Sequence, residues 1–322
     1  MTDPAADRRE PSAVAMAARL LGPMARIGAS LGSLTTYRVG GPAAVLAEPR
    51  GESDLALVSR AVRETGLPVL VVGKGSNMLV ADAGFPGLAV VVGDALADLA
   101  IEGTLVRAGG GASLPVVARR AAAAGLTGFE WAVGVPGSIG GAVRMNAGGH
   151  GSDMAACLVR ARVFDLVSGV VGWRDIDALG LAYRTSNLTP TDVVVEAEIR
   201  CEPGDADSAS AAIAEIVRWR RANQPGGQNA GSVFANPPGD AAGRLIEEAG
   251  LRGFRMGTAE VSPKHANFIQ ADDGGSADDV KRLIDEVRAR VRQSMGVELR
   301  TEVRLIGFEL PYPQGMTSRG DR

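Results

Sequence analysis

The chain has 322 residues, of which 46% are hydrophobic and 22% are charged, an ordinary globular composition that leaves room for two or three compact domains. Its formal net charge of −3 offers no basic surface for nucleic acid, so we expect small-molecule partners and no nucleic-acid partner. Two histidines and two widely spaced cysteines disfavour a metal site, a disulfide framework and a Ser/His/Asp triad, which directs attention to an organic cofactor.

The first 18 residues are rich in Ala, Pro and charge without sustained periodicity, and they predict a disordered tail. They hold no apolar stretch of signal-peptide length, so we expect a cytoplasmic location. Apolar residues then recur at helical spacing between 54 and 65, and the β-branched run at 68–72 predicts a buried strand directly after this helix. No apolar run approaches the roughly 20 residues that cross a bilayer, so we expect no membrane partner.

Mixed helices and strands continue to about residue 203. Short apolar runs predict further strands at 88–92, 104–108, 159–167 and 193–200. An Ala-rich stretch predicts a helix at 113–124. Together they indicate an α+β domain pair. The segment 202–208 combines Pro, Gly and acidic residues ahead of a helical stretch at 212–222, so we expect a hinge there and a third domain after it.

A long helix is expected late in this third domain. Ser276 has the position of an N-cap, with Asp279 three residues further on. The apolar face of the helix consists of Val280, Leu283, Ile284, Val287 and Val291. The β-branched run at 301–307 predicts a final strand, and the polar, turn-rich residues 311–322 predict a second tail.

Two glycine-rich segments point to a bulky ligand. GKGSN at 73–77 follows the expected strand and could bind a pyrophosphate through its backbone N–H groups, although a plain tight turn explains it equally well. It matches neither a Walker A loop nor the GxGxxG fingerprint. WAVGVPGSIGGAVRMNAGG at 131–149 is denser in glycine and interleaved with apolar residues, unlike a flexible linker. We therefore expect its backbone to approach a ligand closely.

Over residues 34–307 the chain resembles the UDP-N-acetylenolpyruvoylglucosamine reductase family. The resemblance rests on the joint order and spacing of several segments, none decisive alone. They are TTYRVGGPA at 35–43, GKGSNMLVAD at 73–82, GFEWAVGVPGSIGGAVRMNAGG at 128–149, YRTS at 183–186, GSVFANP at 231–237, AGLRGFRMG at 249–257 and KHANFI at 264–269.

This resemblance implies an α+β fold with a two-part FAD-binding domain of the vanillyl-alcohol-oxidase (PCMH) type, at 19–84 and 85–203, and a C-terminal α+β substrate-binding domain at 204–310. It implies non-covalent FAD, NADPH as co-substrate and a monomer. The reaction would reduce UDP-N-acetylglucosamine enolpyruvate to UDP-N-acetylmuramate in peptidoglycan precursor synthesis. Hydride would pass from flavin N5 to C3 of the substrate, and a proton would be added at C2.

The resemblance also assigns roles to individual residues. Ser232 would give the proton to C2, Arg184 would hold the substrate carboxylate, and Glu302 would stand beside that carboxylate as a hydrogen-bond donor if burial raises its pKa. Taken alone, the three would be a turn serine, a surface arginine and a solvent-facing strand residue. The flavin would contact Tyr37, Arg38, Gly73, Lys74, Gly75, Ser76, Asn77, Val133, Gly134, Pro136, Gly137, Ser138, Ile139, Gly140, Gly141, Asn146, Ala147 and Gly148.

Cationic and amide side chains suit the nucleotide part of such a substrate. The resemblance points there to Asn236, Arg255, Lys264, His265 and Asn267, with Arg220 and Arg221 as further candidates, and it also implies that Tyr183 contacts the substrate. The chain departs from the family at Ala235, where Lys is common, and at His150, where an aromatic residue is usual. The short stretch after YRTS resembles the subgroup that lacks a tyrosine-bearing substrate lid, so access would be gated differently.

Two other functions compete with this interpretation. An FAD-dependent oxidase of small alcohols or sugars on the same scaffold would explain the glycine segments but not the combination of Ser232, Arg184 and Glu302. A non-catalytic flavin- or nucleotide-binding regulator would not require these three residues.

Overall fold

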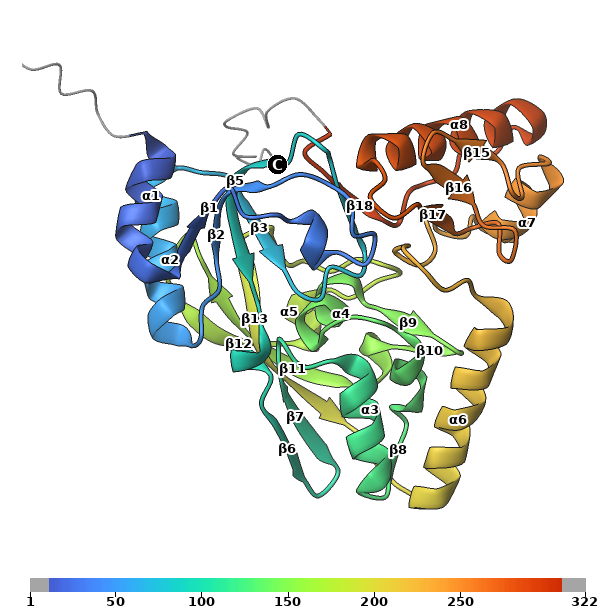
Figure 1. Cartoon of the computed structure of the whole chain (residues 1–322). Coiled ribbons are helices and arrows are strands. Elements are labelled where there is room, and N and C mark those ends of the chain that lie inside the picture. The colour runs from blue at the N-terminus through green and yellow to red at the C-terminus, as the bar shows by residue number, and fades with distance from the viewer. Residues whose placement is uncertain (1–11, 309–322) are drawn as a thin grey trace, which may run out of the picture.

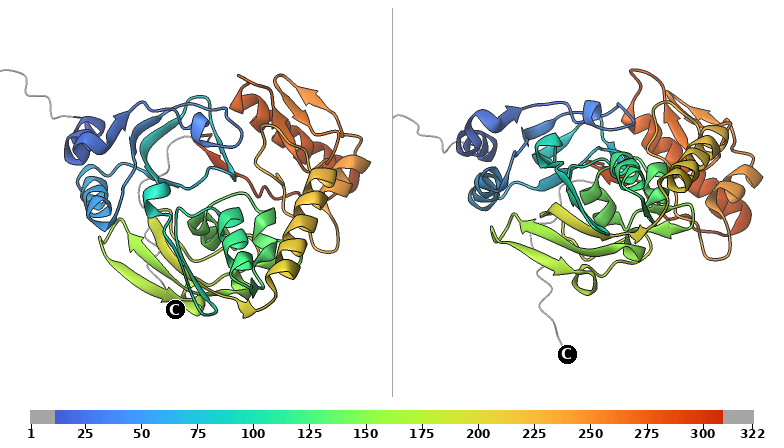
Figure 2. Two further views of the ribbon diagram at one scale, coloured as in Figure 1. Left: turned by 60° about the horizontal axis from the view of Figure 1, so that its bottom comes forward. Right: turned by 90° about the horizontal axis from the view of Figure 1, so that it is seen from below.

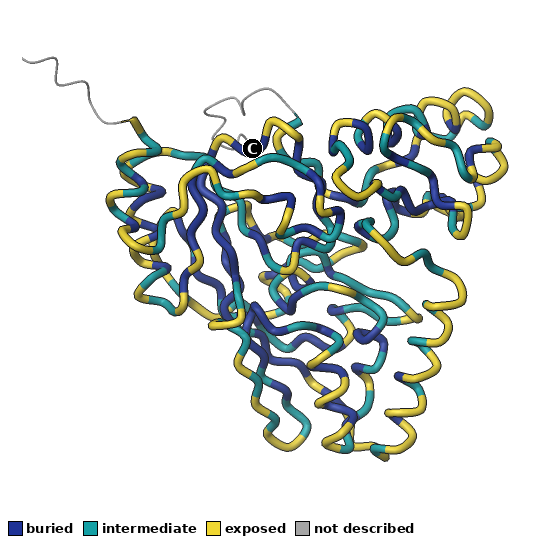
Figure 3. Tube along the Cα trace, viewed as in Figure 1, coloured by how far each residue is buried: buried dark blue, intermediate teal, exposed yellow. Residues whose placement is uncertain are grey.

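The structure, a computed structural model, describes residues 12–308, in which three units of sheet and helix meet (Figure 1). Most of the expected N-terminal tail, residues 1–11, and the expected C-terminal tail at 311–322 lie outside the described residues. Buried backbone is concentrated in the sheets, while the outer faces of the helices are exposed (Figure 3). Buried apolar residues also connect the units, because Phe164 and Val193 of the second unit share a core with Leu55 of the first.

The first unit is a four-stranded sheet with two helices on one face. In sheet order its strands are β1 (Ala25–Ile27), β2 (Ala43–Ala47), β5 (Phe85–Val91) and β3 (Val69–Val72). Strand β1 is antiparallel to β2, and the other pairs are parallel. Helix α2 (Glu52–Thr65) begins with acidic residues that suit a helix N-terminus and ends at Gly66, whose φ of 63° closes the helix. The predicted helix at 54–65 and strand at 68–72 are confirmed.

The first helix, α1 (Ala13–Leu21), lies where the sequence predicts a disordered tail, so that prediction is wrong from residue 13 onward. Ser12 caps the helix by accepting a hydrogen bond from the Ala15 N–H at 3.2 Å. Ala17 and Leu21 are buried against the first sheet and α2. Ala is the best helix former, and a helix this short is stabilised by packing, which the sequence pattern does not reveal.

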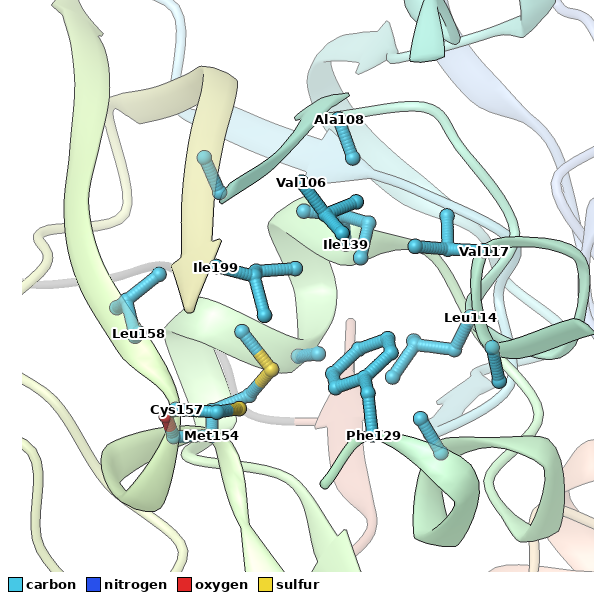
Figure 4. Close-up of a cluster of buried hydrophobic side chains, with 14 of the residues drawn as sticks. Val106, Ala108, Leu114, Val117, Phe129, Ile139, Met154, Cys157, Leu158 and Ile199 are labelled. Atoms are coloured by element: carbon cyan, nitrogen blue, oxygen red, sulfur yellow. The ribbon is translucent and has the colours of Figure 1, made fainter. Parts of the chain in front are cut away.

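The second unit is a five-stranded antiparallel sheet. In sheet order its strands are β12 (Val171–Asp175), β11 (Leu158–Asp165), β13 (Asp192–Arg200), β7 (Leu105–Gly109) and β6 (Leu99–Glu102). Helices α3 (Leu114–Ala123) and α4 (Ile139–Met145) pack on one face, where Phe129 and Ile139 lie in the core (Figure 4). Cys157 and Cys201 are buried in the same core without a disulfide, as expected. The predicted strands and the Ala-rich helix are confirmed.

Helix α6 (Ala206–Asn223) runs from the second unit towards the third (Figure 2). Asp205 caps it by accepting a hydrogen bond from the Ser208 N–H at 2.8 Å, so the helix starts inside the expected hinge at 202–208. Ala209 and Ile213 are buried in the core of the second unit. By its packing the helix belongs with the second unit, although a boundary at residue 204 would group it with the third domain.

The third unit combines α7 (Ala242–Glu248) and α8 (Ala277–Met295) with a small antiparallel sheet. In sheet order its strands are β15 (Arg255–Met256), β16 (Ala259–Val261) and β17 (Ile269–Ala271). The prediction for α8 is confirmed, because Ser276 accepts a hydrogen bond from the Asp279 N–H at 3.1 Å and the whole predicted apolar face is buried. Tyr37 and Leu79 of the first unit are buried in the core of this third unit.

The last strand, β18 (Arg304–Ile306), leaves the third unit and pairs in parallel with β4 (Met78–Val80) of the first. It confirms the final strand predicted at 301–307. The remaining short elements are α5 (Ile176–Leu179), the pair β8 (Leu126–Thr127) and β14 (Glu202–Pro203), and the hairpin of β9 (Gly148–Gly149) and β10 (Ser152–Asp153). Between residues 12 and 308 no helix is both long enough and apolar enough to cross a membrane.

Candidate active site

A cavity of about 820 Å³ lies where the three units meet. Its volume is near the upper end of the roughly 300–1,000 Å³ typical of small-molecule and cofactor sites. Both glycine segments line it, and so do Arg184, Ser232 and Glu302, which come from three distant parts of the sequence. The fold therefore brings together the residues that the sequence singles out for the cofactor and for the chemistry.

The first glycine segment, at 73–77, has no room for a side chain at either of its two glycines. Gly75 has a φ of 60°, and a Cβ atom added there would overlap the backbone oxygen of Leu34. A Cβ atom on Gly73 would overlap Oγ of Ser138. The two glycine segments are also bonded to each other, because Oγ of Ser76 donates to the backbone oxygen of Pro136 at 2.9 Å.

The second segment turns from a 3-10 helix into α4 along the cavity wall. Ser138 caps α4 by accepting a hydrogen bond from the Gly141 N–H at 3.3 Å. The Ile139 and Gly140 N–H groups each donate across 2.8 Å to backbone oxygens next to β7. The side chain of Ile139 is buried in the core of the second unit. The second unit therefore holds the segment at Ile139 and Gly140, while Gly137, Ser138 and Gly141 on either side line the cavity.

Most of the residues expected at the flavin line the cavity. These are Gly73, Lys74, Gly75, Ser76, Asn77, Gly134, Pro136, Gly137, Ser138, Gly141, Ala147 and Gly148. The others do not line it: Tyr37, Val133, Ile139 and Asn146 are buried in the protein, Arg38 is exposed, and Gly140 bonds to the second sheet. Lys74 pairs with Asp94, with 2.6 Å between Nζ and Oδ1.

Arg184 and Glu302 form an ion pair at the cavity wall, with 2.7 Å between Nε and Oε1. The terminal nitrogens of Arg184 also donate to the backbone oxygens of Asn146 at 3.4 Å and Gly148 at 3.0 Å. Burial raises the pKa of Glu302, and this effect exceeds the opposing influence of Arg184. The pair thus combines a fixed cation with a carboxyl that binds a proton more readily than an exposed glutamate.

Asn267 fixes the backbone of Val233 and Phe234, which directly follow Ser232. The buried Asn267 side chain accepts from the Phe234 N–H at 3.0 Å and donates to the Phe234 oxygen at 2.8 Å, and its backbone oxygen accepts from the Val233 N–H at 2.8 Å. Asn267 was expected to contact the nucleotide. Although it lines the cavity, most of its hydrogen-bonding capacity fixes the backbone next to Ser232.

The backbone of Glu302 is joined to both neighbouring segments. Its N–H donates to the Val233 oxygen at 2.7 Å, one residue after Ser232. Its own oxygen accepts from Nδ2 of Asn77, in the first glycine segment, at 3.1 Å. The expected proton donor, the acidic residue and the glycine segment are therefore connected through short backbone contacts.

Three of the residues expected at the substrate, besides Asn267, line the cavity: Tyr183, Arg220 and Asn236. Burial lowers the pKa of Arg220, whose Nε donates to Oε1 of Gln224 at 2.8 Å. Tyr183 is 53% exposed and lies beside the guanidinium of Arg184. Asn236 accepts a hydrogen bond from the Ala242 N–H at 3.1 Å and so fixes the start of α7.

Arg255, Lys264 and His265 lie outside the cavity lining, where other protein groups bind them. Arg255 pairs with Glu260 at 2.7 Å and Asp272 at 2.5 Å. Lys264 donates to the backbone oxygen of Arg221 at 2.5 Å, and Nδ1 of His265 accepts from the Asn267 N–H at 3.2 Å. The sequence shows the charges of these side chains but not the partners that already satisfy them.

Several lining residues were not singled out from the sequence, notably Thr36, Arg144 and Arg304. Arg304 lies two residues after Glu302, and the alternation of side chains along a strand could have suggested it. Arg144 lies inside the second glycine segment. Thr36 has a buried Oγ1 atom without a hydrogen-bond partner, and only its position in TTYRVGGPA drew attention to its neighbourhood.

The two departures from the family pattern lie beside the cavity and do not line it. The His150 ring packs edge-on against Trp219, with 5.1 Å between centroids, and lies next to Gly134. Partial burial and the nearby Arg220 lower its pKa. Ala235 is buried, and its N–H donates to the backbone oxygen of Arg300 at 2.9 Å.

Comparison with known proteins agrees with this arrangement. Residues 42–172 match the FAD binding domain family, and residues 223–306 match the family described as UDP-N-acetylenolpyruvoylglucosamine reductase, C-terminal domain. The UDP-N-acetylenolpyruvoylglucosamine reductase of Heliobacterium modesticaldum is 46% identical over 276 residues, covering 85% of this chain and 88% of the relative. That of Rubrobacter xylanophilus is 42% identical, covering 88% and 96%.

A solved structure leads to the same conclusion. The crystal structure of UDP-N-acetylenolpyruvylglucosamine reductase (MurB) from Thermus caldophilus has a TM-score of 0.76 and 34% identity to this chain, and it covers 88% of this chain and 99% of its own. The expected fold, an FAD-binding domain followed by a family-specific C-terminal domain, is confirmed. The chain belongs to the UDP-N-acetylenolpyruvoylglucosamine reductase family and is an FAD-dependent oxidoreductase.

Proposed function

We propose that this protein reduces UDP-N-acetylglucosamine enolpyruvate to UDP-N-acetylmuramate in peptidoglycan precursor synthesis, with Ser232, Arg184 and Glu302 as its catalytic residues. The observation that carries the proposal is that these three residues line the same cavity as both glycine segments. An oxidase on the same scaffold would need the glycine segments, but it would not need a proton donor beside a paired cation and acid.

The cavity fits FAD on three features of this chain. Its volume suits a large cofactor, the glycines at 73 and 75 leave no room for side chains, and Oγ1 of Thr36 is buried without a partner at the lining. The proposed contacts run along 73–77 and from Gly134 to Gly148. FAD, when bound, accepts hydride from NADPH and supplies it to C3 of the substrate.

Arg184 would hold the substrate carboxylate. A guanidinium has five N–H donors, so the bonds to Asn146 and Gly148 leave others for a ligand. Addition of hydride at C3 moves negative charge through C2 into the carboxylate, and a fixed cation stabilises that charge. Glu302, whose pKa is raised by burial, would donate a hydrogen bond to the same carboxylate in its protonated form.

Ser232 would deliver the proton to C2. A serine hydroxyl is a weak acid in water, but transfer to a carbanion or enolate is downhill, so position matters more than acidity. The contacts of Asn267 with Val233 and Phe234 support this role because they restrict the backbone that carries the serine. Tyr183, Arg220 and Asn236 would then contact the rest of the substrate.

The proposal extends to a monomer that works in the cytoplasm. A single chain supplies every residue named at the cavity, so the site needs no partner copy. Gel filtration with light scattering tests the monomer, and cell fractionation tests the location.

The decisive experiment follows the flavin spectrum without oxygen. The purified protein should be yellow, NADPH should bleach it, and UDP-N-acetylglucosamine enolpyruvate should restore the colour with formation of UDP-N-acetylmuramate. Reoxidation by oxygen after reduction by a sugar or alcohol, without any response to the enolpyruvate, would establish the oxidase instead. A protein without bound flavin would contradict both enzymes.

A further inference from the structure

Asp82, the last residue of GKGSNMLVAD, contacts the third unit although it belongs to the first. Its carboxylate accepts hydrogen bonds from Oγ of Ser276 at 2.5 Å, the N–H of Ala277 at 2.9 Å and the N–H of Asp278 at 3.2 Å. These partners are 194 to 196 residues away in the sequence. None of the roles proposed above uses Asp82.

The contact completes the cap of α8. The first N–H groups of a helix have no partner within the helix, and Ser276 satisfies only the one of Asp279. Asp82 satisfies those of Ala277 and Asp278. Its negative charge also suits the positive end of a helix that is 19 residues long. The best-placed acceptor for this helix therefore comes from a different unit.

A second contact lies at the other end of β4. Nδ2 of Asn77 donates to the Glu302 oxygen at 3.1 Å, and the Arg304 N–H donates to the Asn77 oxygen at 3.0 Å. Both ends of the segment from Asn77 to Asp82 therefore bind the C-terminal part of the chain. Its first residue lines the cavity within GKGSN, and its last residue caps α8.

The N-terminus of α8, which Asp82 caps, is connected to Ser232 through elements that pack against one another. Helix α8 packs on β16 and β17, and Asn267 lies just before β17. Asn267 in turn holds Val233 and Phe234, which follow Ser232. A change in the position of α8 relative to β4 would therefore move Ser232 relative to the first glycine segment.

We propose that Asp82 is a positioning residue that, by capping α8, fixes the third unit and Ser232 relative to the flavin-binding segment of the first unit. The inference rests on the proposed function for its effect on turnover. Its geometric part, the fixed placement of the third unit, can be measured independently of turnover.

The kinetic test compares the two half-reactions of the FAD-loaded Asp82→Ala protein by anaerobic stopped flow. Misplacing a reacting group by about 1 Å can cost on the order of 100-fold in rate. We expect reoxidation by the enolpyruvate substrate to slow by roughly 10- to 100-fold, while reduction by NADPH, which does not need the Ser232 proton, changes by less than about threefold. Asp82→Asn keeps Oδ1 as acceptor for the Ala277 N–H and should recover most of the lost rate.

Asp205→Ala is the matched control. It removes the aspartate that caps α6, and the contacts of this aspartate stay within its own unit. The variant should therefore lower stability without changing the ratio of the reoxidation rate to the reduction rate. An Asp82→Ala protein with normal reoxidation, or with both half-reactions slowed equally, overturns the positioning role. The positioning role is also overturned if Asp205→Ala slows reoxidation and leaves reduction unchanged, as Asp82→Ala is expected to do.

The geometric test measures the distance between spin labels on Ala56→Cys in α2 and Gln293→Cys in α8, both of which are exposed positions. The two native cysteines are buried and should not react. Asp82→Ala should broaden or shift the distance distribution, and Asp82→Asn should restore most of it. An unchanged distribution overturns the inference even if the enzyme is active. A shifted distribution in a protein that fails to turn over the enolpyruvate contradicts only the proposed function.

Discussion

The Nε atom of Arg184 lies 2.7 Å from Oε1 of Glu302, and the two side chains are only 21% and 17% exposed. Arg184 lowers the pKa of this carboxyl, but burial raises that pKa by more. Burial consequently dominates at the carboxyl, and the pKa of Glu302 is raised despite its cationic neighbour. The carboxyl therefore keeps its proton to a higher pH than an exposed glutamate does.

The pH dependence of substrate reduction should follow this carboxyl. Because its folded pKa is raised, protonated Glu302 contributes to stability and to hydrogen-bond donation at low pH, and both contributions are lost as pH rises through that pKa. Glu302→Gln carries an amide donor at every pH. We expect the reoxidation rate of the native protein to decline at high pH in stopped-flow measurements, and we expect Glu302→Gln to lose this decline. An identical decline in both proteins would assign it to another group.

Ser232→Ala should slow reoxidation of the flavin by substrate and leave its reduction by NADPH nearly unchanged. A positioned general acid contributes about 10²- to 10⁴-fold, so flavin reoxidation by substrate should slow by that factor. Reduction by NADPH should change little, because it involves no proton transfer to C2. The reductive half-reaction of the same variant is the control. Equal loss of both rates would contradict the role of Ser232.

Gly75→Ala should lower flavin content. The φ of 60° and the overlap with the Leu34 oxygen leave no strain-free place for a methyl group, so the segment at 73–77 must move. The ratio of absorbance at 450 nm to that at 280 nm measures bound flavin. Gly51→Ala is the control, since its φ of −177° suits any residue and nothing lies within 4 Å of the added atom. Equal flavin content in the two variants would refute the close-approach argument.

Asn267→Ala should destabilise the third unit. The change leaves the buried Phe234 N–H and oxygen without their partner, at a cost of about 1–3 kcal/mol each, so the free energy of unfolding should fall by roughly 2–6 kcal/mol. Urea denaturation measures it. Asn223→Ala removes an exposed amide contact and should change stability by less than about 0.5 kcal/mol. A stable Asn267→Ala protein with weakened substrate binding would restore the original expectation of a nucleotide contact.

Sequence periodicity was sufficient for elements with strong contrast between apolar and polar faces. Helix α8 shows both its cap and its apolar face in the sequence, and β13 contains three consecutive valines followed by alternating charged and apolar residues. Helix α1 has only 9 residues, and a helix this short is stabilised mainly by packing, here against α2, which its own sequence does not show. Local pattern therefore fails where a neighbouring element supplies the stabilisation.

Family motifs located the cavity but could not assign every side chain within it. Arg255 is charged and lies in a matching motif, yet Glu260 and Asp272 bind it away from the cavity. The contact of Asp82 with Ser276 spans 194 residues and leaves no local signature. Such assignments depend on which partners the fold brings together, and a single sequence does not contain that information in readable form.

The pairing of β18 with β4 has a consequence for the order in which the protein matures on the ribosome. Strand β4 ends at residue 80 and its partner at residue 306, so at about 5–20 residues per second β4 leaves the ribosome roughly 10–45 s before β18 is made. Until then the cavity lacks Glu302 and Arg304, and the edge of β4 has no strand to pair with. A nascent chain can form its first two sheets early, but translation of its last strand completes the catalytic cavity.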